Sequence, residues 1–174
     1  PRLPPVRVLH VGGTGLLSSA CADAGIRAGH EVWLLNRGRT RNVPVPDGVH
    51  RLVADARSPA AVAAAVTGTT FDVVVQWIGF TPDQVRADLD LFAGVGQYVF
   101  VSSASVYRKP PAHYLVRESS TPLENPFWQY ARDKIACELL LSEAHRRTGF
   151  PVTVVRPSLT YGPSQIPVCV GSWE

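Results

Sequence analysis

The sequence predicts an α/β fold built on one doubly wound parallel sheet. Short β-branched runs alternate along the chain with longer helical stretches, and the connections between them are short. A glycine-rich turn at residues 12–15 directly follows the first apolar run and precedes the first helical stretch. Right-handed crossovers between parallel strands then give the strand order 3-2-1-4-5-6, which is that of a Rossmann-type sheet with both faces covered.

Each element follows from a local pattern. Strands are expected over residues 6–11, 31–35, 49–53, 71–75, 97–101 and 152–155. Helices are expected over residues 16–28, 58–66, 81–94 and 125–147. Thr81 before Pro82 is typical of a helix start, and Gly29 is typical of a helix end. Prolines and a glycine within residues 42–50 predict a loop there.

The glycine-rich turn predicts a dinucleotide site. Gly12 and Gly15 lack a Cβ atom, so the backbone can adopt positive φ and approach a pyrophosphate closely. The helix that follows presents free N–H groups and its positive dipole end to that phosphate. The third glycine position of the pattern holds Ser18, and we expect a slight shift rather than loss of binding. The residues expected to bind the cofactor here are Gly12, Thr14, Gly15, Leu16 and Leu17.

The end of the second strand bears on which dinucleotide binds. NAD-binding folds usually place Asp or Glu there, to accept hydrogen bonds from the ribose 2′-OH. This chain has Asn36 followed by Arg37. An amide does not repel a 2′-phosphate and a guanidinium can bind it with two hydrogen bonds, so we expect NADP, with NAD as the second choice. The alternative is that the arginines of this segment form a solvated loop.

Two further strand ends are expected near the cofactor. Asp55 follows the third strand, where its carboxylate could touch the adenine or cap the helix that begins near residue 58. Trp77 follows the fourth strand and should lie across the cofactor from the glycine turn, where its ring could narrow the cleft.

Composition argues against several other classes of protein. Hydrophobic residues make up 45% and charged residues 18% of the 174 residues, and the net charge is only +3, with scattered basic residues. That distribution argues against nucleic acid as a partner. No apolar run approaches the ~18–20 residues needed to span a bilayer. The three cysteines lack metal-ligand spacing, so we expect reduced thiols, no metal and a cytoplasmic location.

A second group of residues carries reactive side chains. The fifth strand runs into Ser102 and Ser103, and hydroxyls at the carboxyl end of a central parallel strand lie where such sheets bind ligands. Tyr130 and Lys134 share one face of the long helix. A nearby ammonium should lower the pKa of the tyrosine from ~10, which makes it a usable acid or base. The position of this pair, after the glycine turn and the serines, indicates catalysis.

Together these motifs resemble those of the extended short-chain dehydrogenase/reductase family, in its NAD-dependent epimerase/dehydratase group. The matching segments are residues 12–15, Asp55, residues 102–107, Tyr130 with Lys134, and residues 156–163. Their order and spacing fit from residue 6 to about residue 163. The resemblance implies that Tyr130 is the general acid/base, that Lys134 is its partner and reaches the nicotinamide ribose, and that Ser103 orients the substrate oxygen. Ser102 is the less favoured choice for that serine.

The resemblance also implies the reaction class. We expect an enzyme that transfers hydride between a nicotinamide and a carbon bearing a hydroxyl or keto group, as an oxidoreductase or within an epimerisation or dehydration. A nucleotide sugar is a candidate substrate. Residues 77–85 depart from the usual pattern and are similar to those of an atypical branch that includes chloroplast stem-loop RNA-binding proteins. The alternative is therefore a non-catalytic protein that senses a dinucleotide or binds RNA.

The resemblance bears on domain organisation as well. Residues 1–163 are expected to form one dinucleotide-binding domain, and residues 164–174 to begin a C-terminal region. Members of the family continue into a small domain that forms much of the substrate pocket, so we expect the chain to stop before that domain. Many relatives dimerise through the helices after the fourth and fifth strands, so we expect a homodimer.

Overall fold

The computed structural model describes residues 4–39 and 45–161. Its single sheet has the order β3-β2-β1-β4-β5-β6, and every neighbouring pair of strands is parallel. The strands are β1 (Arg7–Val11), β2 (Glu31–Asn36), β3 (His50–Val53), β4 (Val73–Gln76), β5 (Gln97–Val101) and β6 (Val152–Val155). The helices are α1 (Leu16–Arg27), α2 (Pro59–Val66), α3 (Pro82–Leu91) and α4 (Gln129–Thr148), with a short 3-10 turn, η1 (Ala104–Val106). The predicted fold class and strand order are confirmed.

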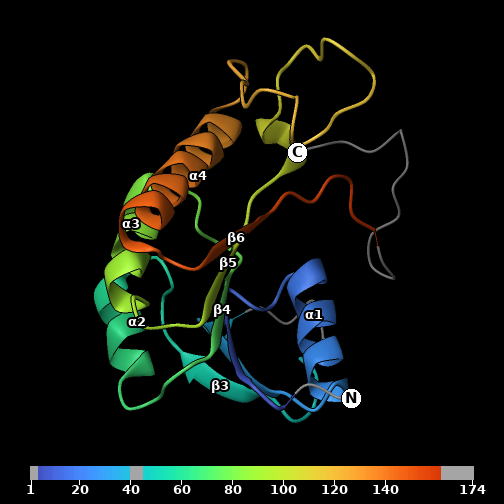
Figure 1. Cartoon of the computed structure of the whole chain (residues 1–174). Coiled ribbons are helices and arrows are strands. Elements are labelled where there is room, and N and C mark those ends of the chain that lie inside the picture. The colour runs from blue at the N-terminus through green and yellow to red at the C-terminus, as the bar shows by residue number, and fades with distance from the viewer. Residues whose placement is uncertain (1–3, 40–44, 162–174) are drawn as a thin grey trace.

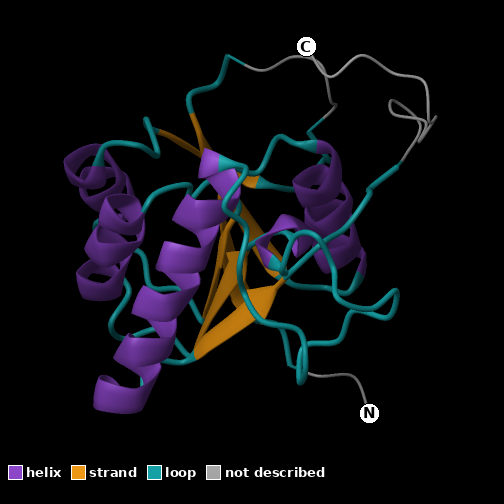
Figure 2. Ribbon diagram, turned by 90° about the horizontal axis from the view of Figure 1, so that it is seen from above, coloured by secondary structure: helices purple, strands orange, loops and turns teal. Residues whose placement is uncertain are grey.

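Helices α2, α3 and α4 cover one face of the sheet (Figures 1 and 2). The main core lies under them, where Leu9, Val74, Tyr98, Phe100 and Leu141 are fully buried. Burial of each large apolar side chain contributes about 1.5–3 kcal/mol relative to an exposed position. This face therefore supplies most of the stability on which the site depends.

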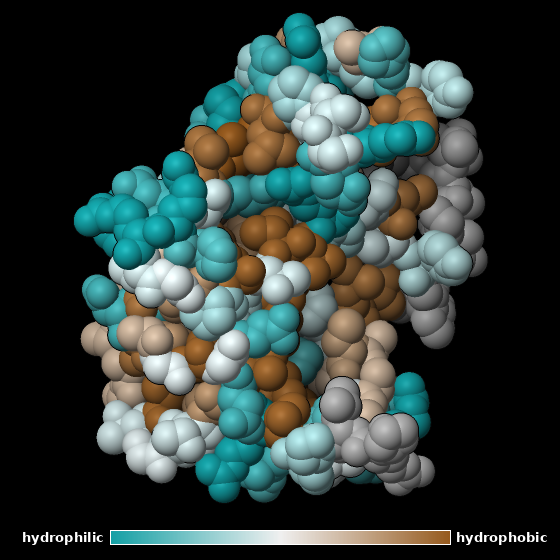
Figure 3. Space-filling model, in the orientation of Figure 1, coloured by the Kyte–Doolittle hydropathy of each residue, from teal (hydrophilic) through white to brown (hydrophobic). Residues whose placement is uncertain are grey.

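The opposite face carries one helix in the described part of the chain, α1. Its Ala22 packs against Val32 and Leu34 of β2 to form a second, smaller core. No other helix of the described residues covers this face, and Val155 of β6 is 44% exposed. Hydrophobic side chains are visible on the surface in this part of the molecule (Figure 3).

The long helix begins later than the sequence pattern predicts, at Gln129 instead of residue 125. The Asn125 side chain donates to the Ser105 carbonyl at 2.8 Å and accepts from the Phe127 N–H at 3.2 Å. These bonds hold the segment as a turn, and Trp128 has an extended backbone with φ of −129°. Asparagine competes for backbone hydrogen bonds in this way, which delays the start of a helix.

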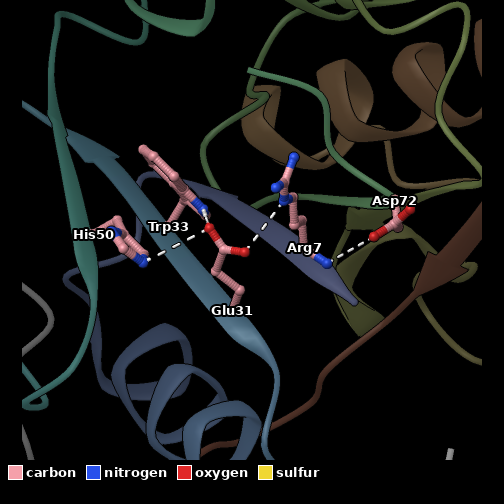
Figure 4. A network of polar contacts seen from close by, with 5 residues as sticks. All are labelled: Arg7, Glu31, Trp33, His50 and Asp72. Atoms are coloured by element: carbon pink, nitrogen blue, oxygen red, sulfur yellow. Dashed lines mark hydrogen bonds and ion pairs between the residues drawn. The ribbon is translucent and has the colours of Figure 1, made fainter. Parts of the chain in front are cut away.

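A polar network joins the amino ends of β1, β2 and β3 (Figure 4). The Glu31 carboxylate accepts hydrogen bonds from Arg7 Nε and Trp33 Nε1, both at 3.1 Å. His50 Nε2 lies 3.7 Å from Glu31, and the Arg7 N–H donates to Asp72 at 2.7 Å. These ends are opposite the carboxyl ends at which parallel sheets bind ligands.

Candidate functional site

A cavity of about 180 Å³ lies at the carboxyl ends of β1 to β4. It is lined by Gly12, Thr14, Asn36, Arg37, Asp55, Ala56, Arg57, Ile78 and Phe80. The lining includes five of the residues that the sequence predicted for the cofactor, namely Gly12, Thr14, Asn36, Arg37 and Asp55. Four separate segments of the chain therefore converge on one hollow, as in other sheets of this topology.

The two glycines of the turn, Gly12 and Gly15, differ in how far the fold itself requires glycine at their positions. Gly12 has a φ of 90°, and a Cβ atom there would lie 2.6 Å from Ile78 Cγ2, so the fold itself requires glycine. Gly15 has a φ of −89°, which any residue adopts, and a Cβ atom there would meet only Ser18 Oγ, at 3.4 Å. Nothing in the described residues requires glycine at position 15.

Ser18 fits at the start of α1 through hydrogen bonds. It is 2% exposed, and its hydroxyl accepts from the Gly15 N–H at 2.7 Å and donates to the Gly15 carbonyl at 3.1 Å. The first-turn N–H groups of Leu16 and Leu17 have no acceptor within the helix, so they remain available to a phosphate. Neither residue is part of the cavity lining, and Gly15 is also outside it.

Trp77 is not among the residues that line this cavity. Its Nε1 donates to His10 Nδ1 at 3.0 Å, and the two rings stack with centroids 5.9 Å apart. Burial lowers the pKa of His10 to about 4, so the imidazole is neutral and Nδ1 can accept. Successive residues at a strand end point to opposite faces, and Ile78 lines the cavity in place of Trp77.

Ser103 and Tyr130 meet beyond the end of β5. Ser103 precedes η1 and caps it, because its hydroxyl accepts from the Ser105 N–H at 3.1 Å. Burial raises the pKa of the Tyr130 hydroxyl, and the nearby Ser103 hydroxyl opposes part of that rise. Ser102, by contrast, is 3% exposed, and its hydroxyl has no partner in the part of the chain that the structure describes. The geometry thus favours Ser103 as the serine beside Tyr130.

Lys134 lies behind this pair and is almost fully buried. Its ammonium donates to the Gly79 carbonyl at 2.9 Å and to the Val101 carbonyl at 2.8 Å. Nζ also lies 4.6 Å from the centre of the Phe100 ring and 5.8 Å from that of Tyr130. Burial lowers the pKa of Lys134 to about 8. The lysine therefore connects the loop after β4 to the end of β5.

The expected lowering of the Tyr130 pKa is not found. Burial raises the pKa of this hydroxyl above its ordinary value, and the opposing effect of Ser103 is smaller. The Lys134 ammonium donates to two carbonyl groups, and the described residues show no hydrogen bond from it to the Tyr130 hydroxyl. Tyr130 consequently carries its proton at neutral pH.

Sequence reasoning missed a buried ion pair beside these residues. Arg156 donates from Nε and Nη2 to the Glu138 carboxylate, with distances of 2.6 to 3.1 Å. Its Nη1 donates to the Tyr107 hydroxyl at 2.9 Å. A signal was present, because Tyr107 and Arg156 lie within the recognised motifs and Glu138 follows Lys134 by one helical turn. Arg57 and Phe80, which line the cavity, were also missed.

Residues 4–39 and 45–161 contain neither a cluster of metal-binding side chains nor a membrane-spanning helix. No group of three or more His, Cys, Asp or Glu side chains is arranged there to hold a metal ion. No helix among them has the length and apolar character needed to cross a membrane.

Known proteins resemble this chain in sequence and in fold. A curated relative, the chloroplast stem-loop binding protein of 41 kDa b from Arabidopsis thaliana, is 24% identical over 169 residues, which are 90% of this chain and 43% of that protein. The UDP-glucose 4-epimerase of Bifidobacterium longum, solved in complex with NAD+ and UDP, superposes with a TM-score of 0.75 at 20% identity and covers 86% of this chain and 52% of its own. The epimerase Mth375 of Methanothermobacter thermautotrophicus gives a TM-score of 0.74 at 18% identity, with coverages of 87% and 51%.

The chain spans about half the length of these proteins. At such identities the structural matches establish the fold. The NAD dependent epimerase/dehydratase family matches residues 8–168, which is nearly the whole sequence. The chain therefore belongs to the NAD-dependent epimerase/dehydratase family.

Proposed function

We propose that the protein is an NAD(P)-dependent oxidoreductase, epimerase or dehydratase acting on a substrate with a hydroxyl or keto group. The observation that carries this proposal is the position of Lys134 Nζ, which bonds the Val101 carbonyl at the end of β5 and lies 5.8 Å from the centre of the Tyr130 ring, close to where Ser103 caps η1. The cavity at the glycine turn lies at the same end of the sheet. Structural neighbours that are UDP-glucose 4-epimerases favour a nucleotide sugar as substrate.

The residues present fit a nicotinamide dinucleotide. Position 15 needs no glycine for packing, which leaves room for a pyrophosphate against the turn. The N–H groups of Leu16 and Leu17 would hold that pyrophosphate, and Asn36, Arg37 and Asp55 would surround the adenosine end. Bound there, the dinucleotide supplies the hydride donor or acceptor. No carboxylate ends β2, which favours NADP over the NAD named for several neighbours.

Tyr130, Ser103 and Lys134 would have separate roles in proton transfer. Tyr130 is protonated at neutral pH because burial raises its pKa, so it can donate a proton to a substrate oxygen and take one back in the reverse direction. The Ser103 hydroxyl would orient that oxygen. Lys134, with a pKa of about 8, is mostly charged at neutral pH, and its ammonium would stabilise the tyrosinate left after donation.

Tyr130→Phe tests the proposal. Turnover of UDP-glucose or UDP-galactose by the purified protein with NADP or NAD should fall by about 10²–10⁴-fold, because general acid/base catalysis is lost. Nicotinamide fluorescence on titration with NADPH and NADH should be unchanged, since the phenol does not line the cavity. Tyr114→Phe, at a side chain that is 99% exposed, is the matched control.

Two outcomes would count against parts of the proposal. Retained turnover in Tyr130→Phe would remove the role assigned to Tyr130. Tighter binding of NADH than NADPH by about tenfold, or ~1.4 kcal/mol, would overturn the preference for NADP.

RNA binding is a second candidate, and one observation favours it. The relative from Arabidopsis thaliana is named as a stem-loop binding protein and aligns over 90% of this chain. Titration with an RNA stem-loop at several salt concentrations tests this function. Tight binding with a steep salt dependence would support it, because phosphate contacts release counterions. The scattered basic residues lead us to expect weak binding.

A homodimer through α3 and α4 is also proposed. A groove of about 690 Å³ runs along these helices and includes the apolar side chains of Leu89, Leu140 and Phe150 in its lining. Light scattering at several protein concentrations should give twice the mass of one chain. The mass of one chain at all concentrations would contradict the dimer.

A further inference from the structure

We propose that Asp88 and Gln76 position the loop after β4 (residues 77–80), which forms one wall of the cavity at the glycine turn and carries an acceptor for Lys134. Both are positioning residues, because neither lines the cavity. Asp88 lies on α3 and Gln76 ends β4, so the pair acts on the site from outside it. The step from the loop to a cofactor rests on the proposed function, in which this cavity holds a dinucleotide.

Asp88 is a buried carboxyl group on the side of α3 that faces the sheet. It is 8% exposed, and its Oδ2 accepts hydrogen bonds from the Tyr98 hydroxyl at 2.6 Å and from Gln76 Nε2 at 2.7 Å. Burial raises the pKa of Asp88, and the two hydrogen bonds oppose that rise. A buried carboxyl group is costly unless it is hydrogen-bonded, so both donors are held towards the same oxygen.

The Asp88 carboxyl group fixes the orientation of the Gln76 amide. A glutamine amide has a donor end and an acceptor end. Because Asp88 Oδ2 accepts, the NH2 end of Gln76 faces α3, and its Oε1 is left to face the loop. There Oε1 accepts from the Ile78 N–H at 3.0 Å. A reversed amide would bring its oxygen against Asp88 and its NH2 group against the Ile78 N–H, so the contact with the loop depends on the contact with α3.

The loop also packs directly on the Gln76 side chain. A Cβ atom on Gly79 would lie 3.0 Å from Gln76 Cγ, so the loop passes close over this side chain where it has a glycine. The same loop meets the glycine turn, because a Cβ atom on Gly12 would lie 2.6 Å from Ile78 Cγ2. Ile78 and Phe80 line the cavity. A shift of the loop would therefore move the cavity wall.

The loop connects Gln76 to the buried lysine as well. The Gly79 carbonyl accepts from Lys134 Nζ at 2.9 Å. Gly79 directly follows Ile78, whose N–H is held by Gln76. The contact between α3 and Gln76 thus bears on where this acceptor for the ammonium lies.

Two variants separate a positioning role from the ordinary explanation, a polar network that stabilises the core alone. Gln76→Met removes both ends of the amide and keeps a side chain of similar length. Tyr98→Phe is the matched control, because it removes the other donor to Asp88 Oδ2 and leaves the contact between Gln76 and Ile78 in place. Each variant takes one donor from Asp88, so both should lower the midpoint of thermal unfolding.

Only Gln76→Met should affect the loop. Hydrogen exchange of the Ile78 N–H, measured by NMR without cofactor, should be about tenfold faster than in the wild type, because that group loses its acceptor. The affinity for NADPH, measured by nicotinamide fluorescence, should fall by about three- to tenfold. Tyr98→Phe should match the wild type in both measurements.

Substitutions of Asp88 give a second test. Asp88→Asn keeps an acceptor oxygen for Gln76, and it should retain the slow exchange and the affinity of the wild type. Asp88→Leu removes the acceptor and frees the amide to reverse, so it should behave as Gln76→Met does. Thermal unfolding of each variant checks that the fold is intact.

Each other outcome counts against a stated part of the proposal. Unchanged exchange at Ile78 in Gln76→Met would overturn the positioning role. Equal changes in Gln76→Met and Tyr98→Phe would assign the network to the core alone. Faster exchange with unchanged affinity for NADPH would overturn the link between the loop and the cavity. A wild type that binds neither NADPH nor NADH would count against the proposed function, and the exchange rates would still decide whether Gln76 holds the loop.

Discussion

The two ends of the sheet carry charged side chains in different surroundings. At the amino end, Glu31 pairs with Arg7, and the two side chains are 37% and 50% exposed (Figure 4). Towards the carboxyl end, Glu138 pairs with Arg156, and the exposed fractions are 4% and 19%. Water screens the first pair, whereas the second has lost most of its hydration and depends on its partner. The Glu138–Arg156 pair should therefore contribute more to the fold and to the site than the exposed Glu31–Arg7 pair.

The buried pair also connects the parts of the candidate site. Arg156 holds Glu138 of α4 and the Tyr107 hydroxyl, which follows η1. The Ala104 N–H donates to the Pro157 carbonyl at 2.9 Å, which joins η1 to the chain after β6. The segment that starts at Ser103 and the helix that carries Tyr130 are thus tied by one guanidinium, whereas the amino-end network joins strand ends alone.

Removal of the buried carboxylate should have the largest effect on stability. Glu138→Ala leaves the Arg156 guanidinium without its counter-charge, and we expect a loss of about 3 kcal/mol, the lower end of the range for broken buried ion pairs. Arg156 keeps partial contact with water, which moderates the loss. Urea unfolding measures the difference. Glu138→Gln keeps an acceptor oxygen and should lose less, and a loss below about 1 kcal/mol in Glu138→Ala would place this pair with the exposed ones.

Much of the fold and part of the site could be predicted because they depend on local patterns. The strand order follows from apolar runs and glycine turns, and five predicted cofactor residues do line one cavity. The start of α4 could not be predicted, because Asn125 bonds Ser105 across 20 residues. The place of Trp77 depends on His10, which is 67 residues away.

The direction of the Tyr130 pKa shift was predicted wrongly for a related reason. The expectation used the spacing of Tyr130 and Lys134 on one helix face, which the structure retains. It could not include the burial of the phenol or the two carbonyl groups that bind the ammonium. Both depend on tertiary packing around the end of β5, and no sequence pattern records them.

His10, a buried residue of β1, gives a second comparison with the exposed amino-end network, because its burial makes stability depend on pH. Burial lowers its pKa from 6.5 to about 4 in the folded protein. The folded state therefore binds this proton less tightly than the unfolded chain, so the stabilisation is complete above pH 6.5 and is lost as the pH falls towards 4. Between pH 7.5 and pH 5.0 the loss from His10 should be about 2 kcal/mol.

His10→Asn isolates this effect, because its amide oxygen can still accept from Trp77 and does not titrate. Urea unfolding at both pH values should show a smaller pH dependence in this variant than in the wild type, by about the same 2 kcal/mol. His113→Asn, at an exposed histidine, should keep the wild-type dependence. Equal pH dependence in all three proteins would show that His10 is protonated as readily in the folded state as in the unfolded chain.

The exposed network should give the smallest effect. Glu31→Gln removes one charge and keeps acceptor and donor groups, so the Trp33 and Arg7 contacts can persist in neutral form. We expect a change of no more than about 1 kcal/mol in the free energy of unfolding at low salt, and less at 1 M salt, where the screening length falls to roughly 3 Å. Glu138→Gln should keep its larger effect in high salt, because the buried pair is screened much less. A loss in Glu31→Gln that equals that of Glu138→Gln and is insensitive to salt would mean that the amino-end carboxylate is as important to the fold as the buried one.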